Sequence, residues 1–163
     1  MKTLFVCRHA KSSWADPALA DFDRPLNDRG LIAAPFMGEL MRKKGLRPLI
    51  ILSSPAMRAK QTAELLKESS GLASKIQCDH RIYEASPQSL RQVVSELDDS
   101  INAAMLVGHN PGIEGFIRFL TGQLEPMPTA ALAVINLKID NWNAIDDGCG
   151  ELQNLYRPKE EMR

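Results

Sequence analysis

Short apolar runs alternating with longer segments of helical periodicity constrain the fold of this chain more than any other feature. Most of the runs are rich in branched residues, which is typical of strands covered on both faces. The four clearest runs are 4–7, 49–52, 103–107 and 131–137, and two weaker candidates are 75–78 and 152–156.

The intervening segments carry apolar side chains at helical spacing. Asn27 is a candidate N-cap for the first helix and Gly45 a candidate stop. Strands that alternate with helices predict an α/β three-layer sandwich, with a mostly parallel central sheet flanked by helices. The chain has 163 residues, no internal repeat and no Pro/Gly/Ser-rich linker, so we expect one domain over residues 1–163.

Charge and cysteine content narrow the function classes. Twenty basic residues balance twenty acidic ones, so no basic excess favours nucleic acid or an anionic membrane. No stretch approaches the ~20 apolar residues of a membrane span, and the start does not resemble a signal peptide. The three cysteines match no zinc-binding spacing, and we expect Cys7 to lie inside a strand. These features predict a cytoplasmic protein.

Reactive side chains follow the predicted strands at their carboxyl ends, where open α/β sheets bind ligands. Arg8 and His9 follow the first run, and Arg58 comes shortly after the second. Glu84 follows the weak run near residue 78, and His109 follows the run that ends at residue 107. We expect these side chains to meet at one edge of the sheet.

This set of groups suits phosphoryl transfer. Arginine guanidinium groups bind phosphate oxygens in pairs, and a protonated histidine adds a further positive charge. A second, neutral histidine attacks phosphorus through one ring nitrogen while the other nitrogen donates to a fixed acceptor. A carboxylic acid protonates the leaving group and later deprotonates water. The scheme requires no metal and no cofactor.

Four segments resemble signatures of the histidine phosphatase superfamily, whose members share the phosphoglycerate mutase-like fold. A lone Arg-His pair carries little information, but four segments in the family's order are a specific signal. The chain departs from the family at Ala10, where glycine is usual. The similar segments are 4–10, 24–30, 53–63 and 107–111.

The resemblance implies that His9 is the phosphorylated nucleophile and that Arg8, Arg58 and His109 complete a phosphate pocket. It places Glu84 where the family often has its proton donor. The short chain is most similar to the SixA-type phosphohistidine phosphatases. Its implied partner is therefore a phosphorylated protein carrying phosphohistidine, or else a small phosphorylated metabolite.

Several alternatives stay open on the sequence alone. The histidines are either structural or metal ligands in the competing interpretations, and Glu84 is either the proton donor or a solvated carboxylate. Lys11 and Arg24 are candidates for the substrate rim, although Arg24 also fits an ion pair with Asp21, Asp23 or Asp28. A small-molecule phosphatase or mutase, and a non-catalytic phosphate-binding module, are the alternative functions. Trp14 and Phe22 are expected to pack onto the body of the protein.

Overall fold

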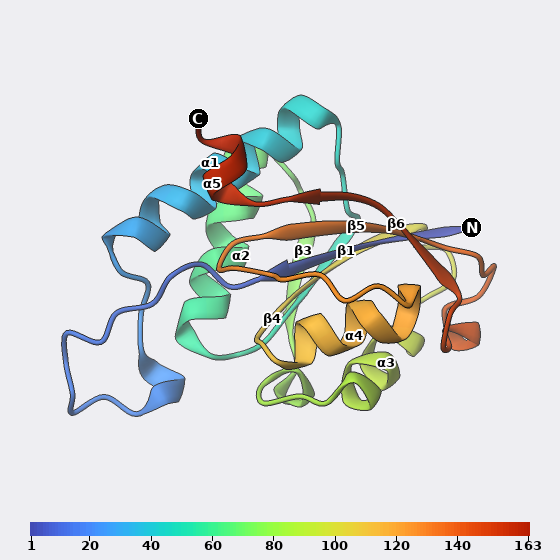
Figure 1. Cartoon of the computed structure of the whole chain (residues 1–163), viewed down its shortest axis with the longest axis horizontal. Helices are drawn as coiled ribbons and strands as arrows, with labels where there is room; N and C mark the ends of the chain where they lie inside the picture. The colour runs from blue at the N-terminus through green and yellow to red at the C-terminus, as the bar shows by residue number, and fades with distance from the viewer.

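The computed structural model describes residues 1–163 and contains one six-stranded sheet with helices on both faces (Figure 1). The strands are β1 (Lys2–Arg8), β2 (Ile50–Ser53), β3 (Lys75–Cys78), β4 (Ala103–Gly108), β5 (Leu132–Leu137) and β6 (Gly150–Tyr156). The helices are α1 (Asp28–Lys44), α2 (Met57–Ser70), α3 (Pro87–Ser95), α4 (Gly112–Thr121) and α5 (Pro158–Glu161).

The sheet order is β3-β2-β4-β1-β5-β6. The first four strands in this order pair in parallel, whereas β5 runs antiparallel to both β1 and β6. The predicted α/β fold with a mostly parallel sheet is therefore confirmed. All six predicted strands are present, with ends that differ from the expected ones by at most two residues.

Two apolar clusters, one on each face of the sheet, form the core. Leu4 and Val6 point into the cluster beneath α3 and α4, while Phe5 and Cys7 point into the cluster beneath α1 and α2. This alternation follows from the two-residue period of a strand. The side chains on both faces of β1 are buried. This explains why the run is apolar throughout, instead of alternating between apolar and polar residues.

The ends of α1 are fixed as the sequence predicted. The Asn27 side chain accepts a hydrogen bond from the Gly30 N–H at 2.9 Å, and Gly45 adopts a left-handed conformation with φ 70°. A Cβ on Gly30 would lie 2.2 Å from the Lys11 carbonyl oxygen. Only glycine therefore allows the start of α1 to lie this close to the segment that follows β1.

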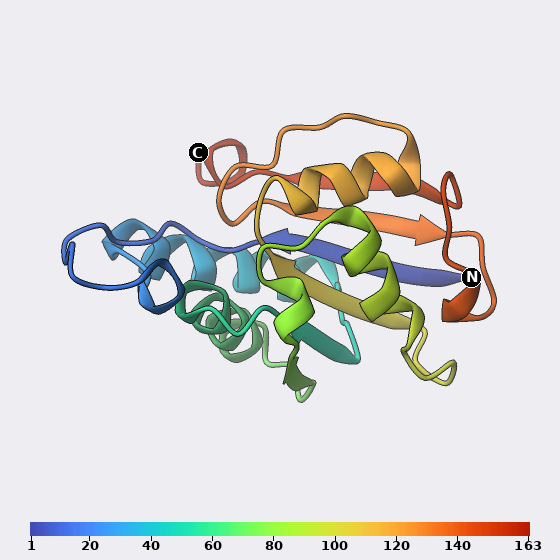
Figure 2. The ribbon, with the colours of Figure 1, turned by 90° about the horizontal axis from the view of Figure 1, so that it is seen from below.

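The carboxyl ends of β1, β2 and β4 lie side by side. Arg8 pairs with Gly108, and Ser53 pairs with Val107. The long connection from β1 to α1 extends from this edge, on the side of the molecule away from the N-terminus, and α5 lies on that side too (Figure 2). None of the helices is both long and apolar enough to cross a bilayer.

Candidate active site

A cleft of about 780 Å³ opens at the carboxyl edge of the sheet. Four of the predicted site residues line it together, namely Arg8, His9, Arg58 and His109. The two candidates for the rim, Lys11 and Arg24, line it as well. Glu84 does not. It borders a neighbouring depression of about 390 Å³, which shares Arg58 and His109 with the cleft.

His9 is held as a neutral imidazole with one nitrogen free. Its Nδ1 lies 2.7 Å from the carbonyl oxygen of Ala10. A carbonyl only accepts hydrogen bonds, so Nδ1 carries the proton and Nε2 carries the lone pair. Burial lowers the pKa of His9 to about 4, and the nearby charges of Arg58 and Arg8 act in the same direction. The His9 ring is thus a neutral imidazole at neutral pH.

Ala10 fits the turn after His9 even though its side chain replaces the family's glycine. Its φ is not positive, so the methyl group causes no backbone strain. The Ala10 N–H donates to Thr62 Oγ1 at 2.9 Å, and the Thr62 hydroxyl donates to the Arg58 carbonyl at 2.7 Å. Thr62, whose role the sequence did not reveal, therefore connects the His9 turn to the helix that carries Arg58.

His109 contacts both His9 and Ser54. Its ring centroid lies 5.0 Å from that of His9, and its Nε2 lies 2.7 Å from Ser54 Oγ. Ser54 Oγ accepts a hydrogen bond from the Ala56 N–H. When His109 carries its proton on Nδ1, the Ser54 hydroxyl donates to His109 Nε2.

In the ligand-free protein His109 is neutral. Burial lowers its pKa to about 3, and the charges of Arg58, of Arg8 and of the His9 ring once that ring is protonated act in the same direction. The protonated histidine expected from the sequence belongs to the complex with a phosphoryl group, which is a different state. A bound dianion would favour the protonated form, because an opposite charge raises the pKa of a histidine.

Two buried side-chain polar atoms have no hydrogen-bond partner, and both belong to the predicted phosphate pocket. They are Arg8 Nε and His109 Nδ1. The Arg8 guanidinium is anchored at one nitrogen, because Nη1 donates to the Met127 carbonyl at 3.1 Å. An unpaired buried donor costs about 1–3 kcal/mol, and in native proteins such groups call for a specific explanation. A site built to receive an anion provides one.

Asp21 joins three side chains behind the cleft. Its carboxylate accepts hydrogen bonds from Arg58 Nη2 at 3.0 Å, Arg24 Nη1 at 2.9 Å and the Tyr83 hydroxyl at 2.7 Å. Its backbone carbonyl accepts a fourth, from Arg58 Nη1 at 2.7 Å. The Tyr83 hydroxyl and the two arginines lower the pKa of Asp21 to about 2. The predicted Arg24–Asp21 ion pair is confirmed, but the sequence did not indicate the contacts with Arg58 and Tyr83.

The connection between β1 and α1 is ordered around Arg24, which is buried. Its Nε donates to the Ser13 carbonyl at 3.0 Å, and its guanidinium lies 3.2 Å from the centre of the Trp14 ring. Trp14 itself stays 77% exposed. Phe22 packs instead against His80 and Tyr83. The expectation of packing onto the body therefore holds for Phe22 and is wrong for Trp14.

Glu84 lies on an exposed turn with an unusual backbone. Its φ is 52°, which is rare for a residue other than glycine and occurs preferentially at functional sites. Next to it, a Cβ on Gly112 would lie 2.4 Å from the Ala85 carbonyl oxygen. Gly112 thus lets the start of α4 lie against the turn, and Glu84 borders the same depression as His109.

The remaining reactive groups offer no second centre at this edge. Cys7 is completely buried in the α1/α2 cluster, and burial raises the pKa of its thiol to about 12. The thiol is thus protonated and inaccessible. The His, Cys, Asp and Glu side chains include no group of three or more arranged to hold a metal ion.

Comparisons with known proteins agree with this geometry. The model of the histidine phosphatase superfamily (branch 1) matches residues 4–106. The uncharacterized protein Rv1276c of Mycobacterium tuberculosis is 28% identical, over 93% of this chain and 99% of the relative.

Two solved structures are also similar. The putative phosphohistidine phosphatase SixA from Agrobacterium tumefaciens is 28% identical, with a TM-score of 0.83 over 96% of this chain and 98% of that one. A mycobacterial glucosyl-3-phosphoglycerate phosphatase shares the fold, with a TM-score of 0.69 and 18% identity over 93% of this chain and 97% of that one.

Proposed function

The chain belongs to the histidine phosphatase superfamily, and we propose that it hydrolyses phosphohistidine through a phospho-His9 intermediate. The observation that carries the proposal is the state of His9. Its Nδ1–H donates a hydrogen bond to the Ala10 carbonyl, which leaves the Nε2 lone pair free. Arg8, Arg58 and His109 line the same cleft. A neutral, oriented imidazole beside a cluster of phosphate-binding groups is what nucleophilic attack on phosphorus requires.

In the first step His9 Nε2 attacks phosphorus, and a bond forms between them as the bond from phosphorus to the leaving group breaks. The guanidinium groups of Arg8 and Arg58 bind the equatorial oxygens, on which negative charge is spread in the transition state. His109 donates its Nδ1 proton to the same phosphoryl group. The leaving group departs with a proton from a carboxylic acid, and phospho-His9 remains.

Glu84 is the carboxyl group best suited to supply that proton. The cleft itself has no carboxylate in its lining, and the neighbouring depression has two, Asp21 and Glu84. Asp21 has a pKa of about 2 and donates no proton near neutral pH. In the second step Glu84 accepts a proton from water, whose oxygen attacks phosphorus, and His9 Nε2 leaves with its lone pair restored.

The width of the cleft favours a phosphorylated side chain as the substrate. A volume of about 780 Å³ far exceeds the space that a phosphoryl group needs, and most of the lining residues are polar or charged. The leaving group of phosphohistidine is an imidazole, which departs easily once it is protonated. Hydrolysis of a small phosphorylated metabolite is the second candidate, because a glucosyl-3-phosphoglycerate phosphatase has the same fold.

Rapid-quench labelling tests the mechanism. The protein is mixed with a 32P-labelled phosphohistidine peptide and quenched within milliseconds to seconds. We expect an acid-labile, base-stable label on His9 that is absent from His9→Ala. Clear turnover by His9→Ala would reject the intermediate. A substrate panel then compares kcat/KM for phosphohistidine peptides with kcat/KM for sugar and nucleotide phosphates, and a higher value for a metabolite would favour the second candidate.

A further inference from the structure

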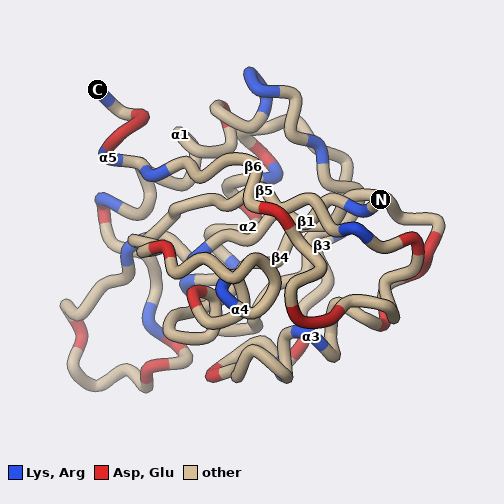
Figure 3. The backbone as a smooth tube through the Cα atoms, turned by 45° about the vertical axis from the view of Figure 1, so that its right-hand side comes forward, with Lys and Arg blue, Asp and Glu red and all other residues tan.

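The lining of the cleft has more positive charge than the phosphoryl group requires. Arg8, Arg58 and His109 suffice for a dianionic phosphoryl group at His9. Two lysines, Lys11 and Lys159, line the same cleft, and no aspartate or glutamate lines it. Because the whole chain has a net charge of zero, acidic residues outside the cleft balance this local excess. In Figure 3 basic and acidic residues are distributed around the rest of the chain.

Neither lysine is neutralised by the protein. Both side chains are exposed, and neither takes part in an ion pair. Arg24, which also lines the cleft, differs from them because it forms an ion pair at 2.9 Å with Asp21, a carboxylate that it shares with Arg58. Lys11 and Lys159 therefore keep their full charge for a ligand.

The position of Lys159 depends on a distant part of the sequence. It lies in α5, next to Arg157, whose Nε donates to the Pro126 carbonyl at 3.1 Å. Arg157 also forms ion pairs with Glu125 at 3.1 Å and Glu160 at 3.5 Å. Arg157 thus attaches α5 to the loop before β5, with its own charge satisfied, and leaves Lys159 at the cleft.

The backbone of Lys11 is equally well fixed. Its carbonyl accepts a hydrogen bond from the Asn27 N–H at 2.9 Å, and Gly30 packs directly against it. The two lysines therefore come from opposite ends of the sequence. The backbone of Lys11 is held directly, and Lys159 is held through the contacts of Arg157.

We propose that Lys11 and Lys159 form a second anion-binding subsite, which holds an additional anionic group of the substrate apart from the reacting phosphoryl group. The proposal rests on the proposed function, because it assumes that the phosphoryl group binds at His9. The chemistry of the additional group is a carboxylate or a phosphate. It belongs either to an acidic residue that flanks phosphohistidine in a protein or to a second acidic group of a small metabolite.

Binding of non-hydrolysable ligands tests the subsite independently of turnover. Two matched pairs distinguish the two sources of the anion. The first pair is a peptide containing a stable phosphonate analogue of phosphohistidine, flanked either by aspartates or by asparagines. The second pair is 3-phosphonopropionate and its carboxamide. Calorimetry gives the Kd of each ligand for the wild type, Lys11→Gln, Lys159→Gln and the double variant.

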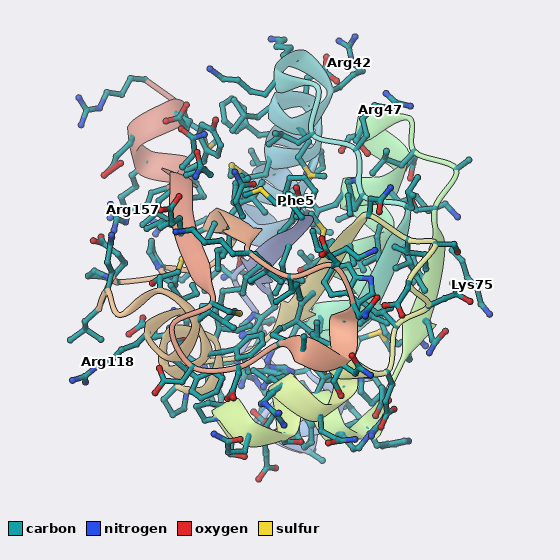
Figure 4. The ribbon with its side chains drawn as sticks, turned by 90° about the vertical axis from the view of Figure 1, so that its right-hand side faces the viewer. Phe5, Arg42, Arg47, Lys75, Arg118 and Arg157 are labelled. Atoms are coloured by element: carbon teal, nitrogen blue, oxygen red, sulfur yellow. The ribbon has the colours of Figure 1, made fainter.

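Lys75→Gln serves as the matched control. Lys75 is exposed, has no ion pair and begins β3, so it lies at the opposite edge of the sheet from the cleft. Figure 4 shows Lys75 and Arg157 on opposite sides of the molecule. This variant removes the same charge from the protein without changing the lining of the cleft.

We expect the wild type to bind the acidic member of at least one pair more tightly than the neutral member. Each lysine variant should reduce that preference by about threefold, the range of exposed ion pairs, and the control should keep it. The preference should also weaken with added salt. A preference in the peptide pair assigns the anion to a protein, and one in the small pair assigns it to a metabolite.

Equal binding of both members of both pairs would overturn the inference, as would a preference that survives in the double variant. Failure of the proposed function has a different signature. In that case the preference for the acidic ligand persists and depends on the lysines, but no phosphohistidine peptide is hydrolysed and His9 acquires no label.

Discussion

Ser54 Oγ lies 2.7 Å from Nε2 of His109, although the two residues are 55 positions apart in the sequence. In the tautomer with its proton on Nδ1, His109 accepts the Ser54 hydroxyl proton at Nε2, and Nδ1 is one of the two unpaired buried polar atoms of the protein. The hydroxyl of Ser54 therefore acts through His109, as a positioning residue.

Replacing Ser54 with alanine should reduce kcat/KM by about tenfold, the effect of one misdirected hydrogen bond of about 1.4 kcal/mol. Nitrogen-15 NMR of His109 should show loss of the single Nδ1–H tautomer. Ser53→Ala is the control, since the Ser53 hydroxyl donates only to the Ser54 carbonyl. A Ser54→Ala protein that keeps the tautomer and loses activity would contradict this role.

The low pKa of His9 predicts how activity depends on acidity. An unperturbed histidine with a pKa near 6.5 would lose most of its neutral form below pH 6. With a pKa of about 4, His9 stays neutral to well below pH 5. After correction for substrate ionisation, kcat/KM should therefore show no His9 titration between pH 7 and 5. NMR titration of the His9 ring provides the direct check, and a midpoint near 6.5 would refute the prediction.

The same shift predicts how stability depends on pH. The unfolded chain binds a proton at His9 near pH 6.5, whereas the folded chain binds it near pH 4. The contribution of His9 to the free energy of unfolding is fully present above pH 6.5 and is lost as the pH falls toward 4. The free energy of unfolding changes over this window with a slope of up to about 1.4 kcal/mol per pH unit. Urea unfolding of His9→Gln should give a shallower pH dependence than the wild type over this window.

Asp21 orients Arg58 through two hydrogen bonds and is itself held by Tyr83. Asp21→Asn should lower kcat/KM by about tenfold, mainly through KM, because Arg58 loses its charged partner while His9 is unaffected. Asp23→Asn is the matched control, since Asp21 and Asp23 both lie in a short 3-10 helix (Asp21–Asp23) and Asp23 forms no ion pair. Equal effects of the two variants would show that general loop charge, and not the Arg58 contact, is responsible.

Glu84→Gln should impair hydrolysis of a serine-type phosphate by about 100-fold, within the range of general acid catalysis. Hydrolysis of phosphohistidine should fall by less than tenfold, because its imidazole leaving group departs more easily. Steady-state kinetics on matched seryl and histidyl phosphopeptides measures both. Equal losses on the two substrates would argue against Glu84 as the proton donor.

Thr62→Val should destabilise the fold by about 1–3 kcal/mol, because the buried Ala10 N–H loses its acceptor while the shape of the side chain is kept. Thermal unfolding measures the loss, and Thr62→Ser should retain most of the stability since it keeps the hydroxyl. A valine variant as stable as the wild type would show that the Thr62 contact contributes little.

Much of the fold and part of the site follow from local sequence. The apolar run at residues 4–7 predicts β1 because both faces of that strand are buried, and Asn27 and Gly45 mark the ends of α1 by capping chemistry. Arg8, His9, Arg58 and His109 could be expected to converge because parallel strands place their carboxyl ends at one edge. No such rule applies to Asp21 and Tyr83, whose contact joins an irregular connection to a turn.

The amino-acid sequence alone specifies the set of reactive groups and the edge of the sheet where they meet. These follow from strand periodicity and from the direction of parallel strands. The tertiary structure alone decided their protonation and partners. Burial and the distances between remote segments set the neutral state of His109, the Ser54 contact and the Asp21 hydrogen bonds. They also bring Lys11 and Lys159 to the lining of one cleft. Such distances are set by packing, and no local pattern encodes them.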